Sequence, residues 1–518
     1  MKVQRFSIGI DIGGTNTDAV LVNDQQTIIA SVKVTTTREI SQGFKTAVAS
    51  LLKQAAVHPS AVQGVFLGTT HAINAILQRQ GLYRVGVIRL AGHQPQTLPS
   101  CYQWPKELKQ AVLAGARTID GGFECDGRAI KDLKPDQIAN AIEELRKLGA
   151  ESLAIIGVFS PLSREQEIGV ANYVKGEMPI SLSCEIGGVG FIERENSTIL
   201  NAALKKVMAQ GFRSLQTACR DLGLNSPLFI TQNDGSLMTL QQAIEYPVLT
   251  MSAGPTNSFR GGALLAKQTN AIVIDIGGTS TDVGLVSKGF PRRSLNTSLI
   301  GGVRLNFSMP DVLSIGLGGG SCISMEAEAF QIGPRSVARE LMEKAKAFGG
   351  DQLTLTDAAL VTGCLCIDQA DPERSGLTRD QANRILSQAF AKVSELACAM
   401  RGGHDYLPMI IVGGGATLFS CVQMPDNCFL PSYFDVANAY GATLSEIAAT
   451  IDTVVSLSQR EATLESLKSQ AVRQAIEQGA DPDKVRLIDQ HILPYPYLPN
   501  QMARVIIRAA GPQKKIKN

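Results

Sequence analysis

The sequence has few aromatic residues and little net charge. Phe, Trp and Tyr make up 5% of its 518 residues, and the formal net charge is +2. Proteins that hold single-stranded nucleic acid stack its bases on aromatic side chains, and proteins that attract polyanions carry an excess of positive charge. We therefore expect no nucleic-acid partner.

Long apolar segments are also missing. No run reaches the roughly eighteen consecutive apolar residues of a membrane-spanning helix, so we expect no membrane partner. The first residues, MKVQRFSIGIDIGG, enter a strand-like pattern at once, and we expect no signal peptide. The ten cysteines are scattered, and the close pair Cys364 and Cys366 has no second pair or histidine at zinc-site spacing. Reduced thiols in a cytoplasmic protein are the expectation.

One fifteen-residue stretch occurs twice. IGIDIGGTNTDAVLV (Ile8–Val22) returns 264 residues later as IVIDIGGTSTDVGLV (Ile272–Val286), with eleven identical positions. In each copy a β-branched, apolar run ends at Gly-Gly, and a second strand-like run follows. The pattern predicts two β-hairpins whose turns are rich in glycine.

These turns have the composition of an anion site. Glycine lets successive backbone N–H groups approach a ligand, and threonine hydroxyls add donors. A carboxylate at the strand end, Asp11 or Asp275, would repel a bare phosphate, so a divalent cation with its waters is expected between them. The residues expected to bind phosphate are Gly13, Gly14, Thr15, Asn16, Thr17, Gly277, Gly278, Thr279, Ser280 and Thr281.

A ligand-free hairpin explains one copy alone about as well as a binding site does, since Gly-Gly turns are common connections. Hairpin geometry does not, however, require the leading Asp or the two Thr residues, and both copies have them. A third glycine loop, Gly413–Gly415, follows the apolar run Met409–Val412 and is suited to the base and ribose of a nucleotide. The P-loop and dinucleotide fingerprints are both absent from the sequence.

The two hairpins and the third loop resemble the nucleotide site of the superfamily that contains actin, the heat-shock chaperone ATPases and the sugar kinases. The resemblance implies an α/β fold in which two ribonuclease-H-like domains face a cleft for ATP and Mg²⁺. It implies that Asp11 and Asp275 are the catalytic carboxylates and that they hold Mg²⁺ through water. It also implies that Val436–Ala448, rich in small residues, is a connecting helix.

Further stretches are similar to the hydantoinase/5-oxoprolinase family, specifically its A-type subunit. They are FLGTTHAINAILQRQG (Phe66–Gly81), IERENSTILNAAL (Ile192–Leu204), TQNDGSLM (Thr231–Met238), SAGPTNSFRGGA (Ser252–Ala263), IGLGGGSCIS (Ile315–Ser324) and LTLTDAALVTG (Leu353–Gly363). This resemblance implies ATP-dependent opening of a cyclic amide, such as a hydantoin or 5-oxoproline, with a separate B-type subunit. A homo-oligomer is a further option.

Five residues are candidates for contact with the substrate: Thr70, His71, Asn74, Gly318 and Gly319. Helix capping and a surface histidine explain the first three as well as substrate contact does. Two stretches depart from the family pattern. Arg335 replaces a glutamate in IGPRSVARELMEK (Ile332–Lys344), and SPLSREQE (Ser160–Glu167) lacks a histidine. These departures concern the substrate rather than the ATP site.

The length allows two or three domains. We expect two actin-like ATPase domains, at residues 1–185 and 186–450, and a small C-terminal cap at 451–518. The periodicity predicts helices at 134–148, after the third glycine loop and at 460–478, and a strand at 228–231. QMARVIIRAAG (501–511) has the alternating pattern of an edge strand. Two other functions share the nucleotide site and stay open at this point. One is a small-molecule kinase, and the other is an ATP-driven conformational switch or activator.

Overall fold

Each copy of the repeat forms the β-hairpin that its pattern predicts. The computed structural model describes residues 5–14, 16–37, 39–92, 98–174, 176–294, 298–307, 309–326, 329–403, 406–496 and 501–514. In it β1 (Phe6–Ile12) pairs antiparallel with β2 (Asn16–Asn23), and β11 (Ala271–Ile276) pairs with β12 (Thr281–Ser287). The register is the same, because Asp11 lies opposite Asp18 and Asp275 lies opposite Asp282.

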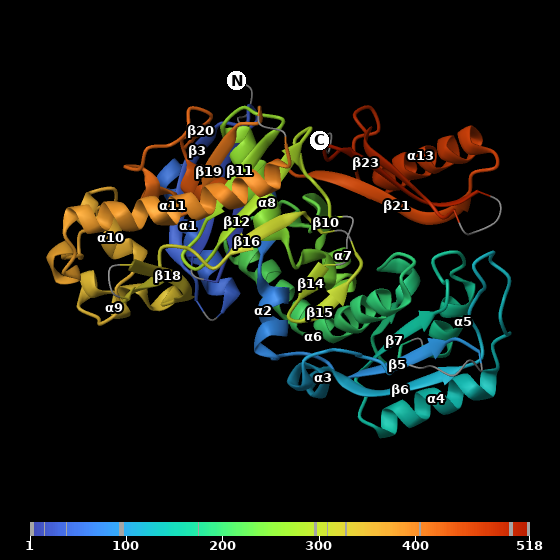
Figure 1. The fold of residues 1–518 in the computed structure, drawn as a ribbon. Helices are drawn as coiled ribbons and strands as arrows, with labels where there is room; N and C mark the ends of the chain where they lie inside the picture. Colours follow the sequence, from blue (N-terminus) through green and yellow to red (C-terminus); the bar gives the residue numbers. More distant parts are fainter. Residues whose placement is uncertain are drawn as a thin grey trace.

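The first hairpin belongs to a nine-stranded sheet (Figure 1). Its order is β22 (Arg486–Pro494), β23 (Met502–Gly511), β21 (Glu446–Ser456), β10 (Ser236–Thr239), β9 (Leu228–Thr231), β4 (Val62–Thr69), β1, β2 and β3 (Ile28–Thr35). Helix α1 (Ile40–Ala55) covers one face, where Phe44 and Val48 pack against Ile8 and Ile10. The predicted strand Leu228–Thr231 is confirmed as β9.

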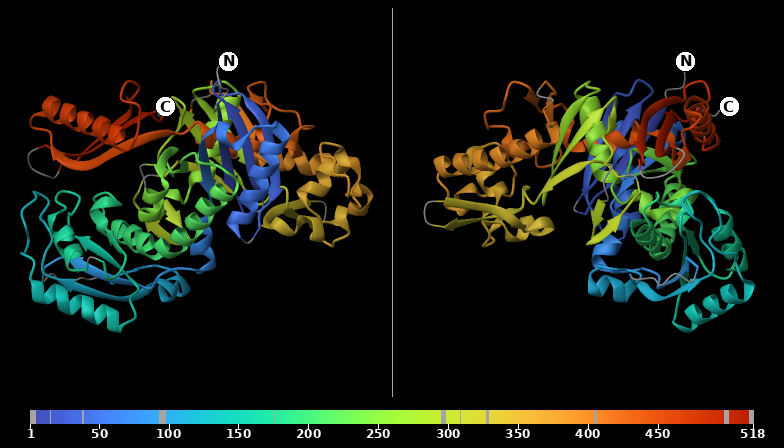
Figure 2. Two further views of the ribbon diagram at one scale, coloured as in Figure 1. Left: turned by 180° about the vertical axis from the view of Figure 1, so that it is seen from behind. Right: turned by 45° about the vertical axis from the view of Figure 1, so that its right-hand side comes forward.

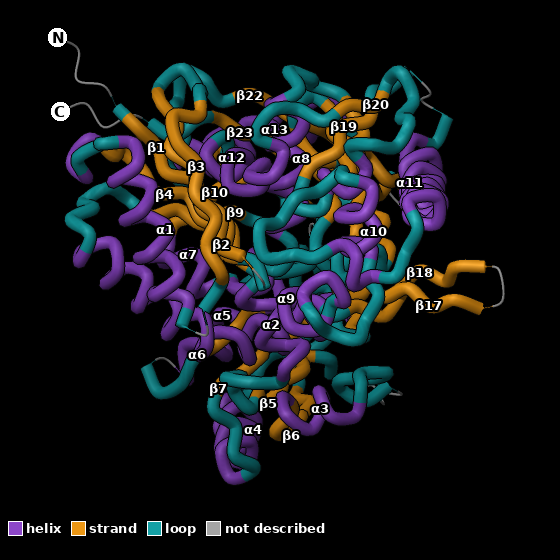
Figure 3. Tube along the Cα trace, turned by 90° about the vertical axis from the view of Figure 1, so that its left-hand side faces the viewer, coloured by secondary structure: helices purple, strands orange, loops and turns teal. Residues whose placement is uncertain are grey.

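The second hairpin belongs to a six-stranded sheet. Its order is β13 (Phe290–Pro291), β12, β11, β19 (Met409–Val412) and β20 (Cys428–Phe429), with β16 (Val312–Ile315) also paired to β12. Helix α11 (Arg379–Arg401) packs Ile385 and Val393 against Ile272 and Ile274 on one face. Helix α10 (Leu355–Thr362) packs beside α11, and α9 (Leu341–Lys344) lies next to the hairpin of β17 (Ser321–Glu326) and β18 (Ala329–Ser336), which projects from the body in Figure 3.

Two short helices lie between the sheets. Helix α12 (Ala437–Thr443) packs on the first sheet, and α8 (Ala253–Leu265) packs on the second. Their backbones nearly touch, because a Cβ at Gly261 would lie 1.8 Å from the carbonyl oxygen of Ala437 and one at Gly441 would lie 2.0 Å from that of Asn257. Only glycine fits here. The small-residue connecting helix expected at Val436–Ala448 is therefore present but shorter, since its last residues enter β21.

An inserted α/β unit follows β4 and α2 (His71–Gln78). Its four-stranded sheet has the order β6 (Leu113–Ile119), β5 (Val85–Leu90), β7 (Ser152–Gly157) and β8 (Ile180–Leu182). Helices α4 (Pro135–Lys147) and α5 (Glu165–Val174) cover it, and α3 (Lys106–Val112) precedes β6. The predicted helix at 134–148 is confirmed as α4, with Ile138, Ile142 and Leu145 buried.

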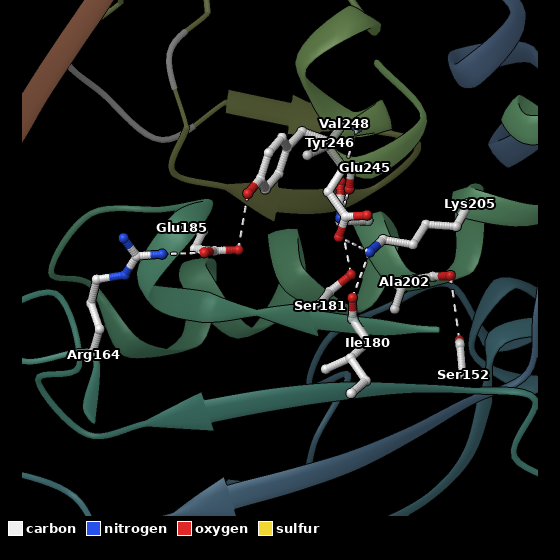
Figure 4. A network of polar contacts seen from close by, with 11 residues as sticks. Ser152, Arg164, Ile180, Ser181, Glu185, Ala202, Lys205, Glu245, Tyr246 and Val248 are labelled. Atoms are coloured by element: carbon white, nitrogen blue, oxygen red, sulfur yellow. Dashed lines mark hydrogen bonds and ion pairs between the residues drawn. The ribbon is translucent and has the colours of Figure 1, made fainter. Parts of the chain in front are cut away.

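Helix α6 (Phe191–Asp221) fastens this unit to the rest of the chain. Glu195 is 1% exposed and accepts two hydrogen bonds from Arg89 of β5, at 2.8 and 2.6 Å. One turn and a half further on, Asn201 donates to Ser181 at 2.9 Å, and Lys205 forms an ion pair with Glu245 of α7 (Leu240–Glu245), as Figure 4 shows. The stretch Ile192–Leu204 therefore supplies polar contacts between the insert and the core.

The C-terminal strands extend the first sheet. β21 pairs parallel with β10, and β23 lies between β21 and β22, with α13 (Arg460–Glu477) packed on β21 and β23. The edge-strand interpretation of β23 is wrong, because strands pair with it on both sides. In Figure 2 this part and the insert extend to the same side of the molecule.

The sheets do not divide at residues 185 and 450. The nine-stranded sheet combines strands from 6–69, 228–239 and 446–511, and the insert at 85–182 has a sheet of its own. The division into domains stays a prediction. The strands of the nine-stranded sheet come from three separate stretches of the chain, whereas those of the six-stranded sheet all lie within residues 271–429. Within the described ranges no helix is long and apolar enough to cross a membrane.

The Arg89–Glu195 pair gives a test of how the insert is held. Glu195→Gln is expected to lower the free energy of unfolding by about 3–5 kcal/mol, because it leaves a buried guanidinium without its counter-charge. Glu107→Gln removes the acid of an exposed pair with Arg79 and should cost under about 1 kcal/mol. Urea unfolding measures both, and equal losses would contradict this role for Glu195.

Candidate functional site

The turns of the two hairpins have the same geometry. The Gly13 N–H donates to the carbonyl of Asn16 at 3.0 Å, and the Gly277 N–H donates to that of Ser280 at 2.9 Å. Gly14 and Gly278 are exposed, with no atom within 4 Å of where a Cβ would stand. Thr15 lies outside the described residues, whereas Asn16 and Thr279 are exposed at the turns. Both turns thus present open backbone to a ligand.

The two threonines that end the turns are directed into the protein. The Thr17 hydroxyl lies 3.1 Å from that of Thr36, and Thr36 donates to the Gly13 carbonyl at 3.0 Å. Thr281 donates to the Leu317 carbonyl at 2.7 Å. Thr17 and Thr281 are completely buried. The hydroxyls of Thr17 and Thr281 therefore bond within the protein and support the turns from behind.

Asp11 lies at the centre of a polar cluster at the end of β1. Asn438 of α12 donates to Asp11 and to Asp18, both at 3.0 Å. Lys33 of β3 forms an ion pair with Asp18 at 2.7 Å and donates to the Asp435 carbonyl at 3.1 Å. The second carboxylate oxygen of Asp11, Oδ1, is buried and has no hydrogen-bond partner among the described residues. One acid is thus neutralised by lysine and the other is left with a free oxygen.

Asp275 occupies the equivalent place in the second sheet. Burial raises the pKa of Asp275 to about 6, and the nearby Ser258 hydroxyl of α8 opposes that shift. Burial also raises the pKa of Asp11 to about 7, with the charges of Asp18 and then Asp275 adding to the effect. Each carboxyl group therefore senses negative charge from the opposite hairpin, so the two half-sites face each other.

The predicted glycine loop joins this cluster. A Cβ at Gly413 would lie 2.2 Å from Asp275 Oδ1, and the Gly415 N–H donates to the Ile276 carbonyl at 2.7 Å. Gly414 is exposed and faces the other half, since its Cβ would stand 3.9 Å from Lys33 Nζ. The stretch after the loop is a 3₁₀-helix (Ala416–Phe419) rather than a long helix. The loop from one sheet thus meets the lysine of the other.

The donor set fits a hydrated magnesium ion better than a directly bound metal. No group of three His, Cys, Asp or Glu side chains among the described residues could hold a metal ion by itself. Mg²⁺ commonly keeps several waters and uses one or two carboxylates together with phosphate oxygens. The free Oδ1 of Asp11 and the raised pKa values of Asp11 and Asp275 are what such a cation would satisfy.

The candidate substrate residues separate into three groups. Gly318 and Gly319 are buried against the second turn, where the Gly319 N–H donates to the Gly277 carbonyl at 3.1 Å. The Thr70 hydroxyl donates to the Ile12 carbonyl at 3.3 Å, and Asn74 donates to Thr70 at 3.1 Å, which places both beside the first turn.

His71 lies away from the turn. Its ring lies against Gly211 of α6, where burial lowers its pKa. The site therefore includes Thr70 and Asn74, whereas His71 packs on a neighbouring helix.

Sequence reasoning missed four polar residues of the site. They are Lys33, Asn257, Ser258 and Asn438. Asn257 lies beside Asp11, because a Cβ at Gly68 would stand 2.5 Å from both Asn257 Nδ2 and Asp11 Oδ1. Asn438 stands within the small-residue helix that the sequence did single out, and Asn257 and Ser258 stand within the glycine-rich stretch at 252–263. Nothing in the local pattern marks Lys33, because its role depends on the pairing of β3 with β2.

Of the two family departures, the one at Arg335 lies close to the site. Val337, two residues later, donates to the Gly320 carbonyl at 2.9 Å, and the Gly320 N–H donates to the carbonyl of Gly278 at 2.7 Å. The departure at Ser160–Glu167 lies in the insert, where Glu167 is buried and accepts the Gly157 N–H at 2.7 Å. The first departure thus borders the second turn, and the second does not.

Two ribonuclease-H-like sheets that bring matching hairpins face to face define an actin-like ATPase fold. Residues 7–178 match the hydantoinase/oxoprolinase N-terminal region, and residues 194–400 match hydantoinase/oxoprolinase. The chain belongs to the hydantoinase/oxoprolinase family.

Solved structures and curated relatives agree with this assignment. The crystal structure of ATP-dependent caprolactamase from Pseudomonas jessenii has a TM-score of 0.76 at 19% identity, covering 99% of this chain and 89% of that chain. The nucleotide-free structure of acetone carboxylase has a TM-score of 0.71 at 18% identity, with the same coverage. These likenesses show the fold.

Among curated proteins, caprolactamase subunit alpha of Pseudomonas jessenii is 25% identical over 394 residues, covering 70% of this chain and 55% of that protein. The acetophenone carboxylase gamma subunit of Aromatoleum aromaticum is 25% identical over 425 residues, covering 74% of this chain and 57% of that protein. The chain therefore spans little more than half the length of these relatives.

The raised pKa of Asp11 predicts how stability depends on pH in EDTA without nucleotide. The unfolded carboxyl ionises near 3.8 and the folded one near 7, so between these values the folded state keeps a proton that the unfolded state has lost. Raising the pH through this window lowers the free energy of unfolding. Asp11→Asn, which cannot ionise, should melt several degrees higher than wild type at pH 8 and close to it at pH 4. A wild-type melting temperature at or above that of the variant at pH 8 would contradict this.

Proposed function

We propose that the chain is the ATP-binding subunit of an enzyme that opens a cyclic amide, such as a hydantoin, 5-oxoproline or a related lactam. The observation that carries the proposal is the facing of Asp11 and Asp275 at the ends of two matching hairpins with open glycine turns. Half-sites of this kind suit a triphosphate, which has acceptor oxygens on both sides. The family assignment and the relatives named for ATP-dependent caprolactamase support a cyclic amide as acceptor.

In the proposed reaction the lactam carbonyl oxygen attacks the γ-phosphorus of ATP. A new P–O bond forms, the bond to the β,γ-bridging oxygen breaks, and ADP leaves. The open backbone at Gly14 and Gly278 orients the phosphates, and positioning supplies most of the catalysis in such a transfer. Asp11 and Asp275 would hold Mg²⁺ through water, and the ion would neutralise phosphate charge.

Phosphorylation makes the amide carbon open to water. Amide resonance protects a five-membered lactam from hydrolysis, whereas an O-phosphorylated carbonyl carries a leaving group. Attack by water on this carbon gives a tetrahedral intermediate, in which the ring C–N bond breaks and the nitrogen takes up a proton, leaving an acyl phosphate. A second water then hydrolyses the acyl phosphate to the ring-opened product and inorganic phosphate. Caprolactamase subunit alpha is by its name one component of an assembly, which supports a B-type partner subunit for this second step. Homo-oligomers of the chain are compatible with such an assembly.

Removal of either carboxylate should abolish ATP turnover. Asp11→Asn and Asp275→Asn are each expected to lower phosphate release with Mg²⁺-ATP by about 100-fold or more, since each removes a charge that orients the cation and phosphates. Asp311→Asn removes an acid of an exposed pair with Arg292 and should leave turnover unchanged. Circular dichroism should show intact folds for all three variants. Wild-type turnover in either site variant would overturn the assignment.

Phosphate release against a panel of lactams, hydantoins, hydroxy acids and carboxylic acids distinguishes the proposal from its rivals. The chain and a B-type subunit together should respond to a cyclic amide. A stable phosphorylated hydroxy or carboxylic acid formed by the chain alone would make it a kinase. ATP hydrolysis without response to any acceptor would make it a conformational switch.

A further inference from the structure

A cavity lies outside the paired hairpins, between the insert and the C-terminal strands. Its volume is about 580 Å³, and its walls come from the exit of the insert (184–188), β10, β21, α13 and the segment after β13. Figure 2 shows that the insert and the C-terminal part extend to the same side of the molecule. Ligand pockets of several hundred Å³ commonly form where separate units of a chain meet.

The acids in the cavity wall already have partners. Glu185 forms an ion pair with Arg164 and accepts the Tyr246 hydroxyl at 3.0 Å, as Figure 4 shows. Asp452 accepts two hydrogen bonds from Arg504, at 2.8 and 2.6 Å. The remaining described acid of the wall is Asp234, which accepts the Ser236 hydroxyl at 2.6 Å and pairs with Arg508 at 3.1 Å. None of these carboxylates calls for a cationic ligand.

Arg293 is the exception among the charged groups of the described wall. It follows β13, which pairs with β12 of the second phosphate hairpin. Its guanidinium has no hydrogen bond or ion pair to any described residue, and its Nη1 is buried without a partner. Burial and then the charge of Arg508 lower the pKa of Arg293, and the charges of Asp234, Asp489 and Asp452 act in the opposite direction. The guanidinium therefore keeps an N–H donor that no described residue uses, and such a donor can bind a further carboxylate.

The rest of the wall offers uncharged hydrogen-bonding groups. Gln470, Gln474 and Gln478 repeat every four residues and so share one face at the C-terminal end of α13. No hydrogen bond from the described residues reaches these three side-chain amides. The Oδ1 of Asn306, another residue of the wall, is also buried without a partner. Amide groups of this kind match the amide or hydroxyl groups of a polar small molecule.

We propose that this cavity binds a small carboxylate that also carries amide or hydroxyl groups, with Arg293 pairing with the carboxylate. Arg is suited to this role because its planar guanidinium can bind a carboxylate through two hydrogen bonds. Asn233 connects the cavity with the nucleotide site. It lines the wall and accepts the Ser252 N–H at 2.7 Å, at the start of the helix whose Ser258 contacts Asp275. The occupant is either the compound that reacts with ATP or a separate effector. In either case it carries a carboxylate group.

Calorimetric titration tests the proposal with 5-oxoproline, glutarate and N-acetylglutamate as carboxylates. 2-Pyrrolidone, which is 5-oxoproline without its carboxylate, is the neutral match. At least one carboxylate should bind wild type, roughly 10-fold or more tighter than Arg293→Gln, because the variant loses a charged hydrogen-bond partner. Arg292→Gln, at the neighbouring exposed arginine paired with Asp311, should bind like wild type. Arg293→Lys should recover part of the affinity.

Melting temperature supplies a second readout. Arg293→Gln should leave the ligand-free protein folded with a cooperative melting transition, and the binding carboxylate should raise the melting temperature of wild type but not that of this variant. No binding of any carboxylate, equal binding to Arg293→Gln, or binding of 2-pyrrolidone as tight as that of 5-oxoproline would overturn the proposal.

Binding of a non-hydrolysable ATP analogue separates this proposal from the proposed function. The analogue should bind wild type and Arg293→Gln equally. Carboxylate binding that stimulates ATP turnover with consumption of the carboxylate identifies it as the reacting compound, and stimulation without consumption identifies it as an effector. Analogue binding without carboxylate binding refutes the carboxylate site alone. Carboxylate binding without analogue binding refutes the proposed function alone.

Discussion

The near-contact of α8 and α12 is the constraint on which the site depends. Gly261 and Gly441 let the two backbones approach to a distance that any side chain would prevent. Each helix also packs on its own sheet, since Ala439 of α12 lies against Val20 and Val22, and Phe259 of α8 lies against Val273. Because the two helices lie in contact between the two sheets, their separation sets the distance between the two hairpins. A larger residue at the crossing would separate the half-sites without altering either hairpin.

The same two helices also deliver the polar groups that control charge in the site. Asn438 of α12 contacts Asp11 and Asp18, and Ser258 of α8 contacts Asp275. These contacts moderate the repulsion between buried carboxylates but do not remove it, because the pKa values of Asp11 and Asp275 stay raised. The remaining repulsion favours a bound cation together with its phosphate ligand. Packing and electrostatics thus act through the same pair of elements.

The sequence predicted those features that depend on neighbouring residues. The hairpins, α4, α13 and the strand at 228–231 follow from periodicity, glycine and proline position, and the repeated Asp and Gly residues led to the site. The sequence did not predict which strands pair when they are far apart along the chain. β23 has the alternating pattern of an edge strand, yet β22 returns to cover it, and Lys33 reaches Asp18 only because β3 lies beside β2. The contact between the insert and α6 is long-range in the same way.

The central claim is that both hairpins contact one nucleotide, and amide hydrogen exchange tests it directly. Exchange would be followed by mass spectrometry in the full chain, with and without Mg²⁺ and a non-hydrolysable ATP analogue. The account predicts slower exchange on binding in peptides covering residues 12–18 and in those covering 276–282, at the same analogue concentration. Protection of one hairpin alone, or of neither while the analogue is bound, would contradict it.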